Sequence, residues 1–156
     1  MPVHSIDDLT SQIAPNKRIL GLDLGSKTIG LAISDSGFRL ASVLDTIRRK
    51  KFTQDAILLE GIINERDVGA LILGLPVNMD GTEGPRCQST RQFATNFLEC
   101  LDIPLAFWDE RLSTAAVERN LIEADVSRAK RAKVVDQMAA SYILQGALDY
   151  LQSRTT

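Results

Sequence analysis

Three acidic positions stand where the sequence otherwise predicts packed structure. Asp23 interrupts an apolar run, and Asp109-Glu110 directly follows a second apolar run. Asp136 shares one side of a predicted helix with small apolar residues. A carboxylate in a packed environment costs several kcal/mol, in the range typical of buried charges, unless a cation compensates it. Carboxylate oxygens are the ligands that Mg²⁺ and Mn²⁺ prefer, so the three positions together predict a divalent metal site.

Each position also has an ordinary structural explanation. Asp23 could end its strand and cap the following turn, and the acids after the second run could form a plain strand end paired with Arg111. Asp136 could be a first-turn aspartate that the helix dipole favours. One such carboxylate proves nothing, whereas three from separate elements favour a shared site.

The histidine count limits the available chemistry. His4 is the only histidine, which excludes a Ser-His-Asp triad, a Cys-His pair and a histidine-rich metal centre. Hydrolysis of a phosphodiester by one or two carboxylate-bound metal ions needs no histidine. The two cysteines, Cys87 and Cys100, are far apart and are expected to be reduced thiols in a cytoplasmic protein.

Bulk composition fits a single globular domain. The chain has 156 residues, of which 44% are hydrophobic and 24% charged, and a net charge of −2. No apolar run approaches the roughly 20 residues that span a bilayer, and the first residues do not resemble a signal peptide. The acidic balance argues weakly against non-specific coating of nucleic acid, but it is compatible with a local basic surface.

The spacing of apolar residues predicts an α/β fold. A hairpin and a third strand come first, and two further strands then alternate with helices. This order predicts a five-stranded mixed sheet, with an antiparallel three-strand meander followed by parallel strands and with flanking helices. Residues 1–17 are expected to be a poorly packed extension, 18–152 the folded domain and 153–156 a tail. The predicted strands are 19–24, 29–33, 39–47, 68–75 and 103–108, and the predicted helices are 52–66, 85–100, 115–122 with Ser113 as N-cap, and one from 127–131 to about 152.

Basic residues cluster in two places. One group lies between Glu110 and Asp136, where a phosphate backbone is the natural partner and a solvated loop the alternative. The other is the run 48–51, Arg-Arg-Lys-Lys, which we interpret as a solvated edge, with contact to a polyanion as the alternative.

Four segments in order resemble the motifs of the YqgF family, whose members are named Holliday junction resolvase-like proteins and pre-16S rRNA nucleases. The segments are Ile19–Asp35, Gly74–Gly84, Trp108–Thr114 and Val135–Ala140. The resemblance implies a ribonuclease H-like fold. It also implies a cytoplasmic, metal-dependent endonuclease that matures the 5′ end of pre-16S rRNA. Leu24 and Thr28 depart from the family's usual aromatic and arginine residues, which affects the hairpin turn and leaves the carboxylates unchanged.

By motif position, the resemblance implies that Asp23, Glu110 and Asp136 are catalytic and bind Mg²⁺ or Mn²⁺, with Asp109 as an additional candidate. The loop 74–84 is either a substrate-binding loop or a long turn, and we favour a substrate role. The expected nucleic-acid-binding residues are Lys27, Asn78, Glu83, Arg86, Arg111, Arg128, Lys130 and Arg131.

Other functions remain open. The same fold could support a Holliday junction resolvase that acts on branched DNA, and fold analogy alone does not establish the substrate. The basic segments could instead serve a non-catalytic RNA-binding or ribosome-assembly factor, with small-subunit precursors as its partners. The 23–28 turn also looks like the first phosphate loop of actin/Hsp70-type ATPases, but a chain of this length supplies only one of the two lobes that such enzymes need.

Overall fold

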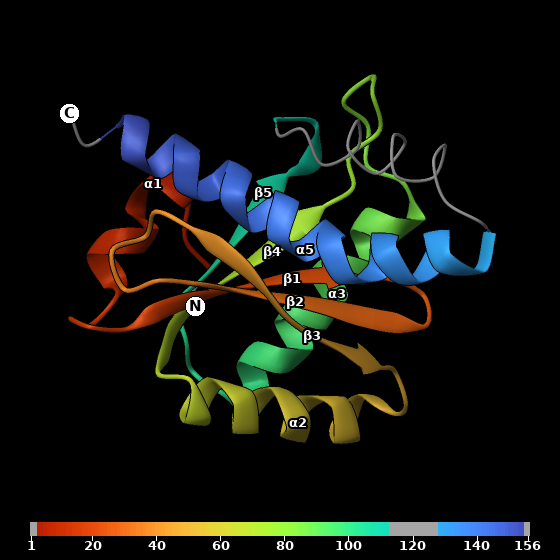
Figure 1. Cartoon of the computed structure of the whole chain (residues 1–156), viewed down its shortest axis with the longest axis horizontal. Coiled ribbons are helices and arrows are strands. Elements are labelled where there is room, and N and C mark those ends of the chain that lie inside the picture. The colour runs from red at the N-terminus through yellow and green to blue at the C-terminus, as the bar shows by residue number, and fades with distance from the viewer. Residues whose placement is uncertain (1–2, 113–127, 155–156) are drawn as a thin grey trace.

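A computed structural model describes residues 3–112 and 128–154, with side chains described for 3–112 and 138–154. A five-stranded sheet forms its centre, in the order β3-β2-β1-β4-β5 (Figure 1). Pairing is antiparallel for β1–β2 and β2–β3 and parallel for β1–β4 and β4–β5, so the predicted mixed sheet is confirmed. The strands are β1 (Arg18–Leu24), β2 (Thr28–Ser34), β3 (Ala41–Arg48), β4 (Val68–Leu75) and β5 (Leu105–Asp109).

Helices cover both faces of the sheet. On one face, α2 (Phe52–Glu65) and α3 (Pro85–Cys100) pack over a core that includes Leu59 and Phe97. On the other face, the long helix α5 (Arg128–Ser153) runs across the strands and contributes Ile143, Leu144 and Leu148 to a second core (Figure 1). The central strand β1 is therefore apolar on both sides, as its sequence indicates.

Strand alternation decides which face each β1 side chain joins. Leu20, Leu22 and Leu24 belong to the core under α2 and α3, whereas Ile19 belongs to the core under α5. Since successive side chains of a strand point to opposite faces, Asp23 projects from the α5 face. It is only partly buried there, near the end of the strand.

The N-terminal segment contradicts the expectation of a poorly packed extension. Val3 forms a parallel bridge with Leu105, and the His4 backbone N–H donates to the Leu105 carbonyl at 2.8 Å. The short helix α1 (Ile6–Leu9) and the 3₁₀ turn η1 (Thr10–Gln12) follow, and Leu9 is completely buried in the core under α5. The Tyr150 hydroxyl also donates to Asp7 at 2.8 Å.

Most predicted elements match the described ones to within a few residues. The strand predicted over 103–108 instead spans Leu105–Asp109, and the 3₁₀ turn η2 (Glu110–Leu112) follows it directly. The predicted helix 115–122 and its N-cap Ser113 lie outside the described residues. Within the described part of the chain, none of the helices is long and apolar enough to cross a membrane.

Candidate active site at the carboxyl ends of β1, β4 and β5

The sheet brings the carboxyl ends of three neighbouring strands to one level. Leu22 pairs with Leu73, so the next step of the parallel register sets Asp23 beside Gly74. Gly74 in turn pairs with Trp108, two residues before Glu110. Because the carboxyl ends of parallel strands are where sites form in α/β sheets, the first two predicted acidic positions lie at the expected edge.

Gly74 makes room for the Glu110 carboxylate. A Cβ atom placed on Gly74 would lie 3.2 Å from Glu110 Oε1 and 2.6 Å from Ile143 Cδ1. The Glu110 carboxylate therefore lies against the bare backbone of β4, on the face covered by α5. Asp23 projects from the same face of the neighbouring strand, so the structure brings these two carboxylates to the same corner of the sheet.

The third predicted carboxylate belongs to the first half of α5. Asp136 lies on this helix one turn before Ala140, which is completely buried against the sheet. Its side chain falls outside the part of the chain whose side chains are described, as do those of Arg128, Lys130 and Arg131. Their predicted roles stay predictions.

Asp109 and Glu110 differ sharply although they are adjacent. Arg111 forms an ion pair with Asp109, with Nη2 2.7 Å from Oδ2, and the Arg111 backbone N–H donates to Oδ1 at 2.9 Å. Hydrogen bonds from the Arg111 side chain hold the pKa of Asp109 below its ordinary value. Asp109 thus fixes the start of η2, and Arg111, predicted to bind nucleic acid, is oriented by this pair.

The loop 76–84 is organised by its own polar residues. The Asn78 side chain donates to the Thr82 hydroxyl at 3.0 Å, and that hydroxyl donates to Asp80 Oδ1 at 2.6 Å. Gly81 adopts a φ of 91°, which favours glycine, and a Cβ there would lie 3.7 Å from Arg111 Nη1. Asn78 therefore shapes a loop that packs beside the end of β5.

Glu83 links this loop to α3. Its carboxylate accepts two hydrogen bonds from Arg91, at 2.7 and 2.8 Å, and the Arg91 guanidinium lies 5.0 Å from the centre of the Phe107 ring. The arginine holds the pKa of Glu83 below its ordinary value. In this arrangement Glu83 connects elements of the scaffold, and sequence spacing gave no sign of its partner.

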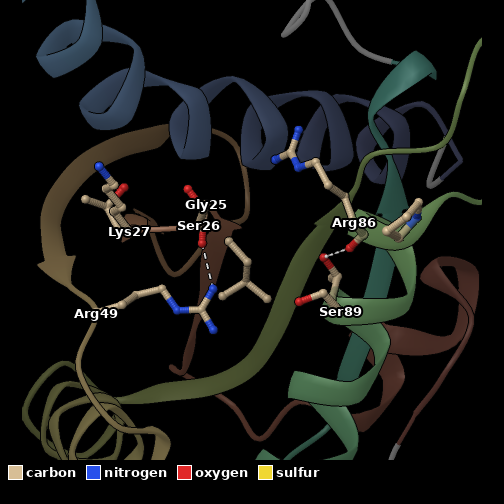
Figure 2. Close-up of a pocket in the computed structure, with 10 residues that line it drawn as sticks. Gly25, Ser26, Lys27, Arg49, Arg86 and Ser89 are labelled. Atoms are coloured by element: carbon tan, nitrogen blue, oxygen red, sulfur yellow. Dashed lines mark hydrogen bonds between the residues drawn. The ribbon is translucent and has the colours of Figure 1, made fainter.

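A basic groove lies between the β1–β2 turn and the first turns of α3 (Figure 2). Lys27 and Arg49 stand on the turn side and Arg86 on the helix side, around a volume of about 550 Å³. Lys27 and Arg86 are predicted nucleic-acid-binding residues, but Arg49 is not. It comes from the 48–51 run interpreted as a solvated edge, which is wrong for Arg49: it is half-buried and donates to the Gly25 carbonyl at 2.6 Å.

Comparison with known proteins shows the family of this chain. A family model described as "RuvX: Holliday junction resolvase" matches residues 17–150. The chain belongs to the RuvX family. A relative from Paramagnetospirillum magneticum named "Putative pre-16S rRNA nuclease" is 60% identical over 149 residues, with 96% of each chain covered. One of the same name from Methylocella silvestris is 55% identical over 150 residues, with 96% of this chain and 93% of the relative covered. The resolvase and nuclease names of these matches are those of the family that the four motifs resemble, so the resemblance is confirmed.

Solved structures support the ribonuclease H-like fold of this RuvX-family chain. Thermus thermophilus RuvC in complex with a Holliday junction substrate superposes with a TM-score of 0.52 at 9% identity, covering 89% of this chain and 96% of RuvC. The yeast mitochondrial Holliday junction resolvase Ydc2 gives a TM-score of 0.51 at 12% identity, covering 96% of this chain and 85% of Ydc2. At these identities the likeness concerns the fold.

Two of the described residues, Asp23 and Glu110, have the oxygen donors that a divalent metal site needs. Where side chains are described, no group of three or more potential ligands comes together. The side chain of Asp136, the third predicted carboxylate, lies outside that part of the chain. The hard oxygen donors of Asp23 and Glu110 suit Mg²⁺ or Mn²⁺. The absence of a side chain at Gly74 leaves the carboxylate of Glu110 room beside the strand that carries Asp23.

Proposed function

We propose that this protein is a metal-dependent endonuclease that hydrolyses phosphodiester bonds of structured RNA during maturation of the 5′ end of pre-16S rRNA. One observation carries the proposal: Glu110 lies against Gly74, at the strand level and on the sheet face from which Asp23 projects. The nuclease name of the relatives supports the reaction class and the RNA substrate. Such a substrate implies a cytoplasmic protein in contact with small-subunit precursors.

In this mechanism Asp23, Glu110 and Asp136 would hold Mg²⁺ or Mn²⁺. When bound, the metal supplies Lewis-acid activation of water and neutralises charge on the phosphate. The protein's own residues provide the frame. Asp23 is set by the central strand, and the Asp109–Arg111 pair fixes the start of η2 so that the Glu110 side chain is presented from a defined turn. With these side chains preorganised by rigid elements, little reorganisation accompanies the reaction.

The test is cleavage of an RNA that carries the precursor 5′ end of 16S rRNA. We expect cleavage with Mg²⁺ or Mn²⁺, none with excess chelator, and a loss of at least about 100-fold in the Asp23→Asn variant, with unchanged thermal unfolding. Asp67→Asn is the matched control. Asp67 lies just before β4, at the opposite end of the strands, its side chain is 72% exposed, and its φ of 55° is one that asparagine tolerates.

Full activity in the presence of chelator, or in Asp23→Asn, would contradict the metal-dependent mechanism. An equal loss in Asp67→Asn would show that the effect of Asp23→Asn is not specific to the carboxyl edge of the sheet.

A second candidate is resolution of branched DNA, which the family description and the fold shared with RuvC favour. A four-way DNA junction in the same assay separates the two substrates. Cleavage of the junction at a higher rate than the precursor RNA would favour the resolvase. Salt-sensitive RNA binding without turnover under any metal would instead indicate a non-catalytic assembly factor.

A further inference from the structure

The groove between the β1–β2 turn and α3 has an unusual charge balance. Its lining includes Lys27, Arg49 and Arg86 and contains no aspartate or glutamate, although the whole chain has a net charge of −2. Within the described part of the chain, these three cations form no salt bridge. By contrast, Arg91 and Arg111 are each paired with a carboxylate.

Arg49 is held in place by the groove itself. Its Nη1 donates to the Gly25 carbonyl at 2.6 Å (Figure 2). Its guanidinium lies 5.8 Å from the centre of the Phe93 ring on α3. The Arg49 backbone N–H also donates to the Lys27 carbonyl at 2.8 Å. An arginine has five N–H donors in a fixed fork, so one bond to Gly25 leaves donors for a planar or tetrahedral anion.

Neutral donors stand between the cations. Ser26 contributes a hydroxyl from the turn, and Ser89 contributes one from α3. The Thr90 hydroxyl is already used, since it donates to the Arg86 carbonyl at 2.9 Å. Cations combined with hydroxyl groups on two facing walls are the donor set that recognises phosphate oxygens.

We propose that this groove is a subsite for a single phosphate group of the polynucleotide, bound by Lys27, Arg49 and Arg86. The inference rests on the proposed function for the identity of the ligand, but not for the existence of the subsite. Gly25 is two residues beyond Asp23 and its N–H donates to the Thr28 carbonyl at 2.8 Å, which closes the turn. A phosphate held by Arg49 is thereby fixed relative to the turn that follows Asp23, so the subsite sets which phosphodiester reaches the carboxylates.

The test measures binding without cleavage. A fluorescently labelled single-stranded RNA of about 12 nucleotides is titrated with the full-length protein in the presence of chelator, at several KCl concentrations. A single phosphate neutralised in this groove contributes about 0.7 in total to the slope of log K against log[salt] for a single strand. We expect weaker binding, and a slope reduced by up to that amount, in Lys27→Gln and in Arg86→Gln, both of which alter exposed side chains.

Lys50→Gln is the matched control because it removes an exposed cation of the 48–51 run that does not line the groove. Its slope should equal that of the unaltered protein. Slopes unchanged in both groove variants, or reduced equally in Lys50→Gln, would overturn the subsite.

Two further comparisons define the ligand and separate the two proposals. The same RNA with a 5′-phosphate or a 5′-hydroxyl distinguishes a terminal from an internal phosphate. If the groove variants reduce the slope only for the RNA with a 5′-phosphate, the groove binds a terminal phosphate. If they reduce it for both RNAs, the groove binds an internal phosphate. Groove-dependent slopes in a protein that cleaves no RNA would support the subsite while rejecting the nuclease. Normal cleavage of RNA with unchanged slopes in the groove variants would support the nuclease and reject the subsite.

Discussion

A missing side chain shapes the candidate site as much as the charged ones do. Gly74 lies on β4, between the strand that carries Asp23 and the strand that leads into Glu110, and its bare backbone accommodates the Glu110 carboxylate. A glycine ending an apolar run reads from the sequence simply as the end of a strand. Its role depends on the neighbouring strand and on α5, so no local pattern could have indicated it.

Gly74→Ala tests this arrangement. The new Cβ would press on Ile143 Cδ1, the flexible end of a side chain that can move, and on Glu110 Oε1. We expect the protein to fold and RNA cleavage to fall by up to about 100-fold, since a displacement of about 1 Å at a catalytic group has that effect. Cleavage rates and thermal unfolding are the measurements.

Gly61→Ala is the control for glycine replacement in general. Gly61 lies in α2, and a Cβ added there would meet nothing within 4 Å, so alanine should raise the free energy of unfolding by about 0.5–1 kcal/mol and leave cleavage unchanged. Unaltered cleavage in Gly74→Ala would mean that Glu110 tolerates a different position.

Adjacent acids show how far the sequence goes at the residue scale. Composition and spacing placed Asp109 and Glu110 at a strand end, and both were candidates there. Only the folded structure distinguishes the surroundings of the two carboxylates. Asp109 forms an ion pair with Arg111, whereas Glu110 lies against Gly74. Arg49 was missed for a similar reason: four consecutive cations look alike until the chain turns and one of them faces Gly25.

At the scale of elements, the sequence predicted most of what is described. Apolar runs located the central strands, helical apolar spacing located α2, and Pro85 indicated the first turn of α3, because burial on one or two faces determines the pattern of apolar residues. The periodicity of apolar residues does not predict how closely two packed elements approach each other. Gly21 on β1 faces Leu144 on α5, and a Cβ there would lie only 2.8 Å from the Leu144 Cβ.

Gly21→Ala should therefore destabilise the protein. The obstructing atom is a Cβ, which moves only with the α5 backbone, so the helix must shift away from the sheet. We expect the free energy of unfolding to fall by about 1–3 kcal/mol, the usual cost of overpacking, as measured by chemical denaturation. A variant as stable as the unaltered protein would indicate that α5 packs less tightly against β1.

The pair that joins the loop 76–84 to α3 should confer pH-dependent stability. Arg91 lowers the pKa of Glu83 from its ordinary value of 4.5, so the stabilising effect is complete above that pH and is lost as the pH falls through the lower folded-state pKa. Glu83→Gln should lower the melting temperature at pH 7, and this difference should shrink as the pH falls below 4.5. A difference that stays constant over this pH range would exclude the ion pair as the cause.

At the scale of the whole molecule, the first residues belong to the folded unit. Their sequence is polar and contains Pro15, which is typical of a loose extension. The pattern did not indicate that Leu9 would reach the core formed with α5, because its partners in that core, such as Leu148 and Leu151, lie near the other end of the chain. Contacts of such separation leave no local trace in a single sequence.

Leu9→Ala measures this contribution. Leu9 is completely buried, so its truncation should lower the free energy of unfolding by about 2–5 kcal/mol. Leu58→Ala on α2, where the leucine is 51% exposed, should change it by no more than about 0.5 kcal/mol. Chemical denaturation of both variants measures these changes. Equal changes in the free energy of unfolding would mean that the N-terminal segment contributes little to the core.

The position of α5 also bears on how the chain is made. This helix follows β1 by more than 100 residues in the sequence, yet it covers one face of that strand. Until it emerges from the ribosome, Ile19 and Ala32 lack the apolar cover that α5 residues such as Ile143 and Leu144 provide, and packing across such a sequence separation is slow. We therefore expect chaperones to bind the nascent hairpin of β1 and β2 until α5 has been synthesised and has packed against it.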